Sequence, residues 1–304
     1  MLKIINSRFA VSARDRFADE IFHLIDEGRS ACLIVPEQQT VLTEKYMTKI
    51  LPPSAVLHFE VTNFTRLANT TFRALGGLSG EYCNSAKKAL IMWRALTELA
   101  PTLTLTSGRK EINAGLVESS LTAVAQMQNL GLHPTDLSLA ADNEEIRKDN
   151  RLAAKLKDLS AIFALYKQLL GERYADTGDD AEAMIKKLLA NPGFLSDTEI
   201  FIEGFSSFTE PQYKLIAILA SRTSVSLSLT LPKGREGAFE YHEIAECQRR
   251  LVSSARKVGA DIKLQREEGY RKNRNEALDE ISDLLWTTNR PNDNITLHLL
   301  RKRL

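Results

Sequence analysis

Residues 31–47 read ACLIVPEQQTVLTEKYM, and residues 56–66 read VLHFEVTNFTR. In each stretch an apolar run is followed at once by a polar cluster, at 37–40 in the first and at 62–66 in the second. If the two runs are parallel strands, both clusters lie at strand carboxyl ends, the edge where open α/β sheets bind their ligands. The two stretches therefore predict a binding site at one sheet edge and leave its ligand open.

The alternation of strands and helices continues at both ends of the chain. Short apolar or alternating runs predict strands at 2–5, 31–35, 56–61, 199–203, 224–231, 260–264 and 295–299. Helical spacing predicts helices before Gly28 and at 40–50, 64–75, 210–219 (opened by Thr209), 245–258 and 276–285. This order indicates a mostly parallel sheet with right-handed crossovers. A strand so near the end of the sequence also leads us to expect the N-terminal piece of a longer protein.

The middle of the chain contains no convincing strand. Its helical segments are 87–99, 112–130, 152–170 and 179–189. In the third, large apolar residues repeat at helical spacing, which is typical of a helix-bundle core. The stripe consists of Leu152, Leu156, Leu159, Phe163, Tyr166 and Leu170. We therefore predict one α/β domain made of 1–84 and 190–304, with a helical insertion at 85–189.

The composition is that of a globular protein with little net charge. Lys and Arg total 40 against 39 Asp and Glu, so a nucleic-acid contact must be a local groove rather than a broad basic surface. Cys32, Cys83 and Cys247 match no metal spacing and are expected to be reduced thiols, with Cys32 in a core strand. Trp93 and Trp286 are expected in the core. No membrane span or signal peptide is visible, so we expect a cytoplasmic protein.

The turn after the first strand is where a phosphate-binding loop would lie. Such a loop needs glycines, a lysine, and a Ser or Thr for magnesium. This turn has no glycine or lysine, and the side chains of Phe9 and Val11 would block close approach. We interpret this turn as a degenerate phosphate-binding loop. The loop residues considered are Ser7, Arg8, Ala10, Ser12, Ala13 and Arg14. The strand at 199–203 has the place of a second nucleotide motif but offers one acid, Glu203, which is more typical of a structural role.

Four segments together resemble the AddB (RexB) family, the B subunits of AddAB-type helicase–nucleases. They are LIVPEQQTVLTEKYM (33–47), VTNFTRLANTTFRALGG (61–77), YADTGDDAEAMIKKL (174–188) and IFIEGFSSFTEPQYKL (200–215). The resemblance covers essentially the whole chain in the same order. It implies an N-terminal superfamily 1 helicase-like domain of the P-loop NTPase class, with a 1B-like helical insertion. Many family members resemble an intact P-loop here, and this sequence departs from that pattern.

The resemblance also implies a role in double-strand break repair by homologous recombination. In this family the B subunit does not drive translocation, but holds the 3′-ended single strand and scans it for the recombination signal Chi. The implied partners are single-stranded DNA and an AddA-type subunit in a heterodimer. Full-length members carry an iron–sulfur cluster and a magnesium-dependent nuclease. Neither motif is seen in this chain, so we expect no cofactor, no metal and no activity of its own here.

The family pattern assigns DNA contacts to three strand ends. The assigned set is Gln38, Thr40, Phe64, Arg66, Phe205 and Phe208. Gln and Arg can hydrogen-bond to base edges, and each Phe offers a stacking face worth about 1–3 kcal/mol per base. Unpaired bases expose their full hydrogen-bonding edges, so a loop can read them without a groove.

Structural alternatives for the same residues stay open. Gln38 and Thr40 can cap the next helix, Phe64 can be a core residue, and Phe208 can be a hydrophobic staple. Arg66 can be a solvated surface charge or a partner of Glu60. Two other functions also stay open: an active ATP-dependent helicase motor, and a purely structural scaffold for the A subunit.

Overall fold

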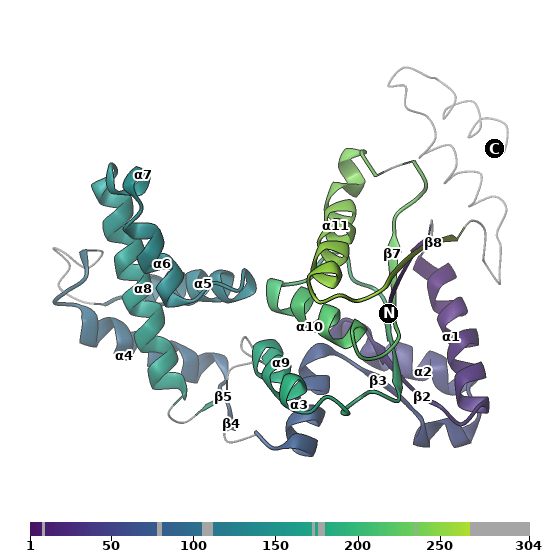
Figure 1. The fold of residues 1–304 in the computed structure, drawn as a ribbon. Helices are drawn as coiled ribbons and strands as arrows, with labels where there is room; N and C mark the ends of the chain where they lie inside the picture. The colour runs from purple at the N-terminus through teal and green to yellow at the C-terminus, as the bar shows by residue number, and fades with distance from the viewer. Residues whose placement is uncertain are drawn as a thin grey trace, which may run out of the picture.

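The structure is a computed structural model that describes residues 1–7, 10–77, 81–104, 112–171, 174–175, 180–234 and 236–267 (Figure 1). The strands are β1 (Leu2–Ser7), β2 (Ser30–Ile34), β3 (Phe59–Thr62), β4 (Glu81–Tyr82), β5 (Tyr174–Ala175), β6 (Thr198–Ile202), β7 (Val225–Thr230) and β8 (Ile262–Glu267). The α-helices are α1 (Ala10–Asp26), α2 (Thr40–Ile50), α3 (Phe64–Leu75), α4 (Ser85–Leu99), α5 (Ala114–Asn129), α6 (Pro134–Ala141), α7 (Glu144–Arg147), α8 (Asn150–Gly171), α9 (Asp180–Ala190), α10 (Glu210–Ala220) and α11 (His242–Lys257). The elements predicted at 276–285 and 295–299, and Trp286, lie outside the described residues.

Within the described residues six strands form one sheet in the order β3-β2-β6-β7-β1-β8, and every neighbouring pair is parallel. The predicted mostly parallel sheet is therefore confirmed. In the register, Ile34 of β2 lies opposite Thr62 of β3 and Ile202 of β6. These three strands consequently end at the same level, and the segments that follow them begin at one edge of the sheet.

Helices cover both faces of the sheet, because its central strands are apolar on both sides. On one face α1 and α2 pack over strand residues such as Leu33 and Phe201. On the other face α3, α9, α10 and α11 pack over residues such as Ile34 and Ile202. Adjacent residues such as Leu33 and Ile34 therefore serve opposite faces, as the two-residue period of a strand requires. Cys32 also lies in this core, as predicted, and burial raises the pKa of its thiol to about 12.

A second core joins α4, α5, α6 and α8. The C-terminal half of the predicted stripe forms its centre: Phe163, Tyr166 and Leu170 are buried, whereas Leu152 is 41% exposed. The sequence did not reveal the short parallel pairing of β4 with β5 that lies beside this core. The prediction that Trp93 lies in the core is wrong, because its side chain on α4 is 49% exposed.

Helix α9 lies within the range predicted for the insertion but packs against α3 and α10. Its Met184 and Leu188 are fully buried in the core that underlies the sheet. The chain therefore returns to the α/β core at α9, one element before β6.

Local boundaries differ from the predictions where pairing or capping decides them. Residues Pro53–Leu57 form a 3₁₀ turn rather than the start of a strand, since pairing with β2 begins only at Phe59. Thr40 is not the N-cap of α2: the N-cap is Gln39, which makes no side-chain cap bond. Thr209 does cap α10, and its hydroxyl accepts a hydrogen bond from the Gln212 N–H.

Candidate functional site

The segments after β2, β3 and β6 meet at the carboxyl edge of the sheet. Past the strand ends, the Glu203 N–H still donates to the Ile34 carbonyl at 3.1 Å, which holds two of the loops in register. Parallel pairing therefore brings together three segments that are far apart in the sequence. They are 36–40, 62–66 and 203–208.

Three of the predicted contact residues form one aromatic cluster at this edge. The ring centroid of Phe64 lies 5.5 Å from that of Phe205 and 6.0 Å from that of Phe208, and Phe205 lies 5.0 Å from Phe208. Phe208 is only 7% exposed and also packs on Tyr213, with 5.6 Å between ring centroids. Phe64 and Phe205 are half-buried. Phe208 thus forms the base of the cluster, while Phe64 and Phe205 keep part of their rings open.

Arg66 lies in the first turn of α3 and points toward α2. The turn is fixed by Asn63, whose Oδ1 accepts a hydrogen bond from the Arg66 N–H at 2.8 Å. The Arg66 guanidinium pairs with Glu44 rather than with Glu60, at 3.1 Å between Nη1 and Oε1. Both side chains are about half exposed, at 51% and 42%. Such a pair is weak in water, so a stronger ligand can take the guanidinium from it.

Arg66 also borders a groove of about 520 Å³ between α2 and edge strand β3. The floor is largely apolar and includes Met47, Leu51 and Val61. Glu44 and Glu60 lie on its walls with Arg66. The groove therefore combines an apolar floor with charged walls. It lies beside α3, the helix that carries Phe64 of the aromatic cluster.

Gln38 and Thr40 lie on the same loop but face different surroundings. Gln38 belongs to the 3₁₀ turn Glu37–Gln39 and is exposed. Thr40 is 4% exposed, and its hydroxyl lies 3.5 Å from the Pro36 carbonyl. The Gln38 amide therefore lies at the surface, whereas the Thr40 hydroxyl is buried.

Gly204 lies where segment 203–208 packs closely against segment 36–40, and sequence reasoning missed this role. Its φ of +82° is a conformation that side-chain-bearing residues rarely adopt. A Cβ at this position would lie 2.8 Å from Gln39 Oε1 and 3.1 Å from Pro36 Cδ. Only glycine lets the two loops approach this closely. The signal in the sequence was a glycine placed directly after a strand and before an aromatic residue.

Arg14 and Glu203 form an ion pair at the place of the two expected nucleotide motifs. Arg14 Nε donates to Glu203 Oε1 at 2.8 Å. Glu203 is 3% exposed, and its second oxygen is buried without a partner among the described residues. Burial raises the pKa of Glu203 above the usual glutamate value, and the nearby Arg14 guanidinium opposes that rise. Each charge therefore has the other as its partner, whereas the second Glu203 oxygen has none among the described residues.

Asp15 and Tyr46 pack beside this pair and were not predicted. The Tyr46 hydroxyl donates to Asp15 Oδ1, and burial together with this hydrogen bond raises the pKa of Tyr46. The Arg14 guanidinium lies 5.9 Å from the centroid of the Tyr46 ring. Ser7 is buried at the end of β1. Of the other loop residues, Arg8 lies outside the described residues, and Ala10, Ser12 and Ala13 begin α1.

Two absences hold for the described part of the chain. There, no three His, Cys, Asp or Glu side chains gather in a way that could hold a metal ion. Likewise, none of the described helices has the length and apolar character needed to cross a membrane.

Comparison with known proteins identifies the family. The family model described as "ADDB, N-terminal" matches residues 15–282. The chain is 30% identical over 234 residues to the ATP-dependent helicase/deoxyribonuclease B subunit of Acetivibrio thermocellus, covering 76% of this chain and 20% of that protein. It is 32% identical over 216 residues to the protein of the same name from Caldanaerobacter subterraneus, covering 69% and 18%. For Clostridium perfringens the identity is 27% over 297 residues, covering 94% and 25%.

The chain thus spans a quarter or less of the length of these relatives. Within that span, the family model covers every strand of the main sheet except β1. This chain therefore belongs to the family of AddB N-terminal regions.

Proposed function

We propose that this chain is the non-motor, helicase-like N-terminal domain of the B subunit of a helicase–nuclease, and that it binds single-stranded DNA. The observation that carries the proposal is the make-up of the carboxyl edge. An exposed amide, a weakly paired guanidinium and two half-buried aromatic rings lie there on adjacent loops: Gln38, Arg66, Phe64 and Phe205. Hydrogen-bonding groups beside aromatic faces are the combination that binds unpaired bases.

In this proposal the six predicted residues divide into two groups. Arg66 and Gln38 hydrogen-bond to base edges or phosphates, and Phe64 and Phe205 stack on bases. Thr40 and Phe208 act from beneath, since both are buried. Thr40 supports the turn that presents Gln38, and Phe208 supports the ring of Phe205. Recognition of Chi would then come from the exposed group.

The Arg14–Glu203 pair supports a non-motor role. A motor of the P-loop class needs a cation for the phosphates and an acid for magnesium at these two places. Here the cation and the acid are 2.8 Å apart and bound to each other. The proposed superfamily 1 helicase-like domain therefore has a degenerate P-loop that does not turn over ATP.

The biological setting is part of the same proposal. The relatives are named as the B subunit of a helicase/deoxyribonuclease, and we assign this chain to a cytoplasmic heterodimer with an AddA-type subunit that repairs double-strand breaks by recombination. The iron–sulfur cluster and magnesium-dependent nuclease that the family implies are assigned to parts of the protein outside this chain.

The test is single-stranded DNA binding by the 304-residue chain, measured by fluorescence anisotropy. Arg66→Ala is expected to weaken binding about tenfold, equivalent to about 1.4 kcal/mol, because a guanidinium contact is lost. The matched control is Arg94→Ala on α4, since Arg94 forms a similarly exposed pair with Glu98. Equal affinities of the two variants would contradict the site. In the assembled two-subunit enzyme, an unchanged Chi response of Arg66→Ala would contradict its role in recognition.

Two measurements separate this function from the alternatives. Binding of magnesium-ATP to the chain at micromolar concentrations would favour an active motor. Normal assembly with the partner protein, but no DNA crosslink to residues 36–66, would favour a scaffold.

A further inference from the structure

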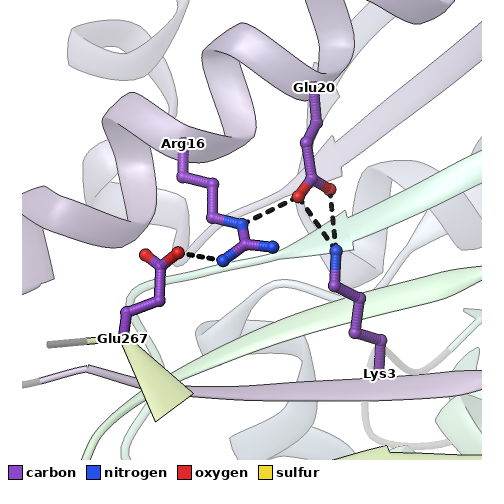
Figure 2. A network of polar contacts seen from close by, with 4 residues as sticks. All are labelled: Lys3, Arg16, Glu20 and Glu267. Atoms are coloured by element: carbon purple, nitrogen blue, oxygen red, sulfur yellow. Dashed lines mark hydrogen bonds and ion pairs between the residues drawn. The ribbon is translucent and has the colours of Figure 1, made fainter. Parts of the chain in front are cut away.

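The two faces of β8, the outermost described strand beside β1, differ in how their charges are paired. On the α1 face, Lys3, Arg16, Glu20 and Glu267 form a connected network (Figure 2). Lys3 Nζ lies 2.9 Å from Glu20 Oε1, Arg16 Nε lies 2.8 Å from the same oxygen, and Arg16 also pairs with Glu267. Burial acts against the charge of Glu20, but hydrogen bonds from Lys3 and Arg16 keep its pKa below the usual value. The charges on this face are therefore paired with one another.

The α11 face of β8 is open by comparison. A groove of about 560 Å³ lies there, and Arg249, Arg256 and Lys257 contribute three cations to its lining. Arg249 pairs with Glu246 at 2.8 Å. Arg256 and Lys257 are exposed, and no described carboxylate pairs with either of them. Within the described residues, the positive charges of Arg256 and Lys257 therefore have no acidic partner.

Cations in the last turn of a helix are common, because they complement the helix dipole. The apolar floor distinguishes this site from an ordinary helix end. Val252 and Leu264 line the same groove as the cations, and Leu264 is 55% exposed although it lies in a strand. An exposed apolar floor beside cations that no described carboxylate pairs with suits a ligand that has both anionic groups and flat apolar faces.

Single-stranded DNA has both properties, with a charged backbone and bases that stack on apolar surfaces. Arg249 and Arg256 are seven residues apart, which places them about 10 Å apart along α11. We propose that the groove between α11 and β8 is a second contact for single-stranded DNA, in which Arg256 and Lys257 bind phosphates and Leu264 lies against a base. This inference rests on the proposed DNA-binding function, but it uses residues remote from the carboxyl edge.

The test compares two double variants of the 304-residue chain by their affinity for oligothymidylate at several salt concentrations. Arg256→Ala/Lys257→Ala is expected to weaken binding about fivefold at low salt. It should also make the slope of log affinity against log salt shallower by about 1.4, for the loss of two phosphate contacts. The control is Arg147→Ala/Lys148→Ala, which removes an adjacent Arg–Lys pair from the exposed end of α7. All four residues are exposed, so both variants should melt like the parent chain.

A second readout reports occupancy of the groove directly. The native cysteines are buried, so Ser253→Cys places a single reactive thiol in the groove for an environment-sensitive dye. Ser119→Cys, on the exposed side of α5, is the matched label. Oligothymidylate should change the dye signal at 253 and not at 119. A response at 253 to polyglutamate but not to oligothymidylate would overturn the proposal in favour of an acidic protein segment.

The outcomes also separate this inference from the proposed function. If Arg66→Ala weakens binding and the groove variant matches its control in affinity and salt slope, the groove is rejected and the carboxyl-edge site stands. If only the groove variant weakens binding, the groove stands and the edge assignment fails. If the parent chain binds no oligothymidylate, both are rejected.

Discussion

Two regions of one sheet edge treat their polar side chains in opposite ways. Above β1 and β6, Arg14 and Glu203 pair with each other, and Glu203 is almost fully buried. Above β2 and β3, Gln38 is exposed, and Arg66 makes a half-exposed ion pair with Glu44. The first region satisfies its charges internally, whereas the second leaves hydrogen-bonding groups available to a ligand.

The contrast shows that a place in the fold does not by itself make a binding site. Both regions lie at carboxyl ends of parallel strands, where ligand sites are usual. What differs is whether the polar side chains at each place are already paired with one another. In the first region a partly buried ion pair takes the place of a ligand, and in the second the partners are solvent and one weak ion pair.

The largest expected effect is on the aromatic cluster of the open region. Phe208→Ala should destabilise the protein by about 3–5 kcal/mol, because it removes a buried ring. Phe205→Ala should cost less stability, since Phe205 is half-buried, but should weaken DNA binding by about 1–3 kcal/mol. Urea unfolding and anisotropy measure the two quantities. Equal losses of stability in the two variants would contradict the distinction between the buried Phe208 ring and the half-buried Phe205 ring.

The closed region should respond to loss of Arg14. Arg14→Ala should cost about 2 kcal/mol at neutral pH, less than for a fully buried pair, because the Arg14 side chain is 33% exposed. The control is Arg29→Ala, whose partner Glu199 lies on β6, the strand that Glu203 follows. This pair is more exposed, so its loss should cost less than about 1 kcal/mol. Urea unfolding of both variants measures the difference.

The cost of Arg14→Ala should depend on pH in a definite direction. Because the folded pKa of Glu203 is raised, the folded state binds its proton more readily, and the associated stability is lost as pH rises through the folded pKa. Without Arg14 the folded pKa of Glu203 rises further, so more stability is lost as the pH rises. The destabilisation should therefore shrink as pH falls toward the ordinary glutamate value of 4.5. A cost that is constant with pH would mean that charge pairing is not its cause.

The junction of the two regions can be tested at Gly204. Gly204→Ala should cost about 1–3 kcal/mol from its positive φ, plus the displacement of Gln39. Gly259→Ala is the matched control, because Gly259 has a φ of +70° but nothing within 4 Å of the added Cβ. The difference between the two unfolding free energies isolates the close approach of the loops. Equal values would mean that Gln39 moves aside freely.

The smallest expected effect is a gain. Glu44→Gln removes the charge that holds Arg66 and should strengthen DNA binding about twofold to threefold, equivalent to about 0.5 kcal/mol. Glu98→Gln does the same to Arg94 on α4 and should leave binding unchanged. Anisotropy titrations at low salt are the measurement. Weaker binding of Glu44→Gln would indicate that the ion pair orients Arg66 rather than competing for it.

Sequence patterns predicted much of the fold because strands and helices follow local periodicity. The apolar runs around Leu33 and Ile202 predicted strands within one or two residues of their observed ends. The exposure of Trp93 and the 3₁₀ turn at Pro53–Leu57 were missed, since both depend on which neighbours are present in three dimensions. For the candidate site, the polar loops were found from the sequence, but Asp15 and Tyr46 were not.

The sequence alone determined the α/β class, the lack of glycine after the first strand and the presence of polar groups at the strand ends. Those properties depend on residue type and local spacing, which the chain carries before it folds. Only the tertiary structure decided that Arg14 binds Glu203 and that Arg66 binds Glu44. These partners are far apart in the sequence, and the register of parallel strands and the packing of α1, α2 and α3 bring them together. Which strand end is closed and which is open is therefore a property of the fold.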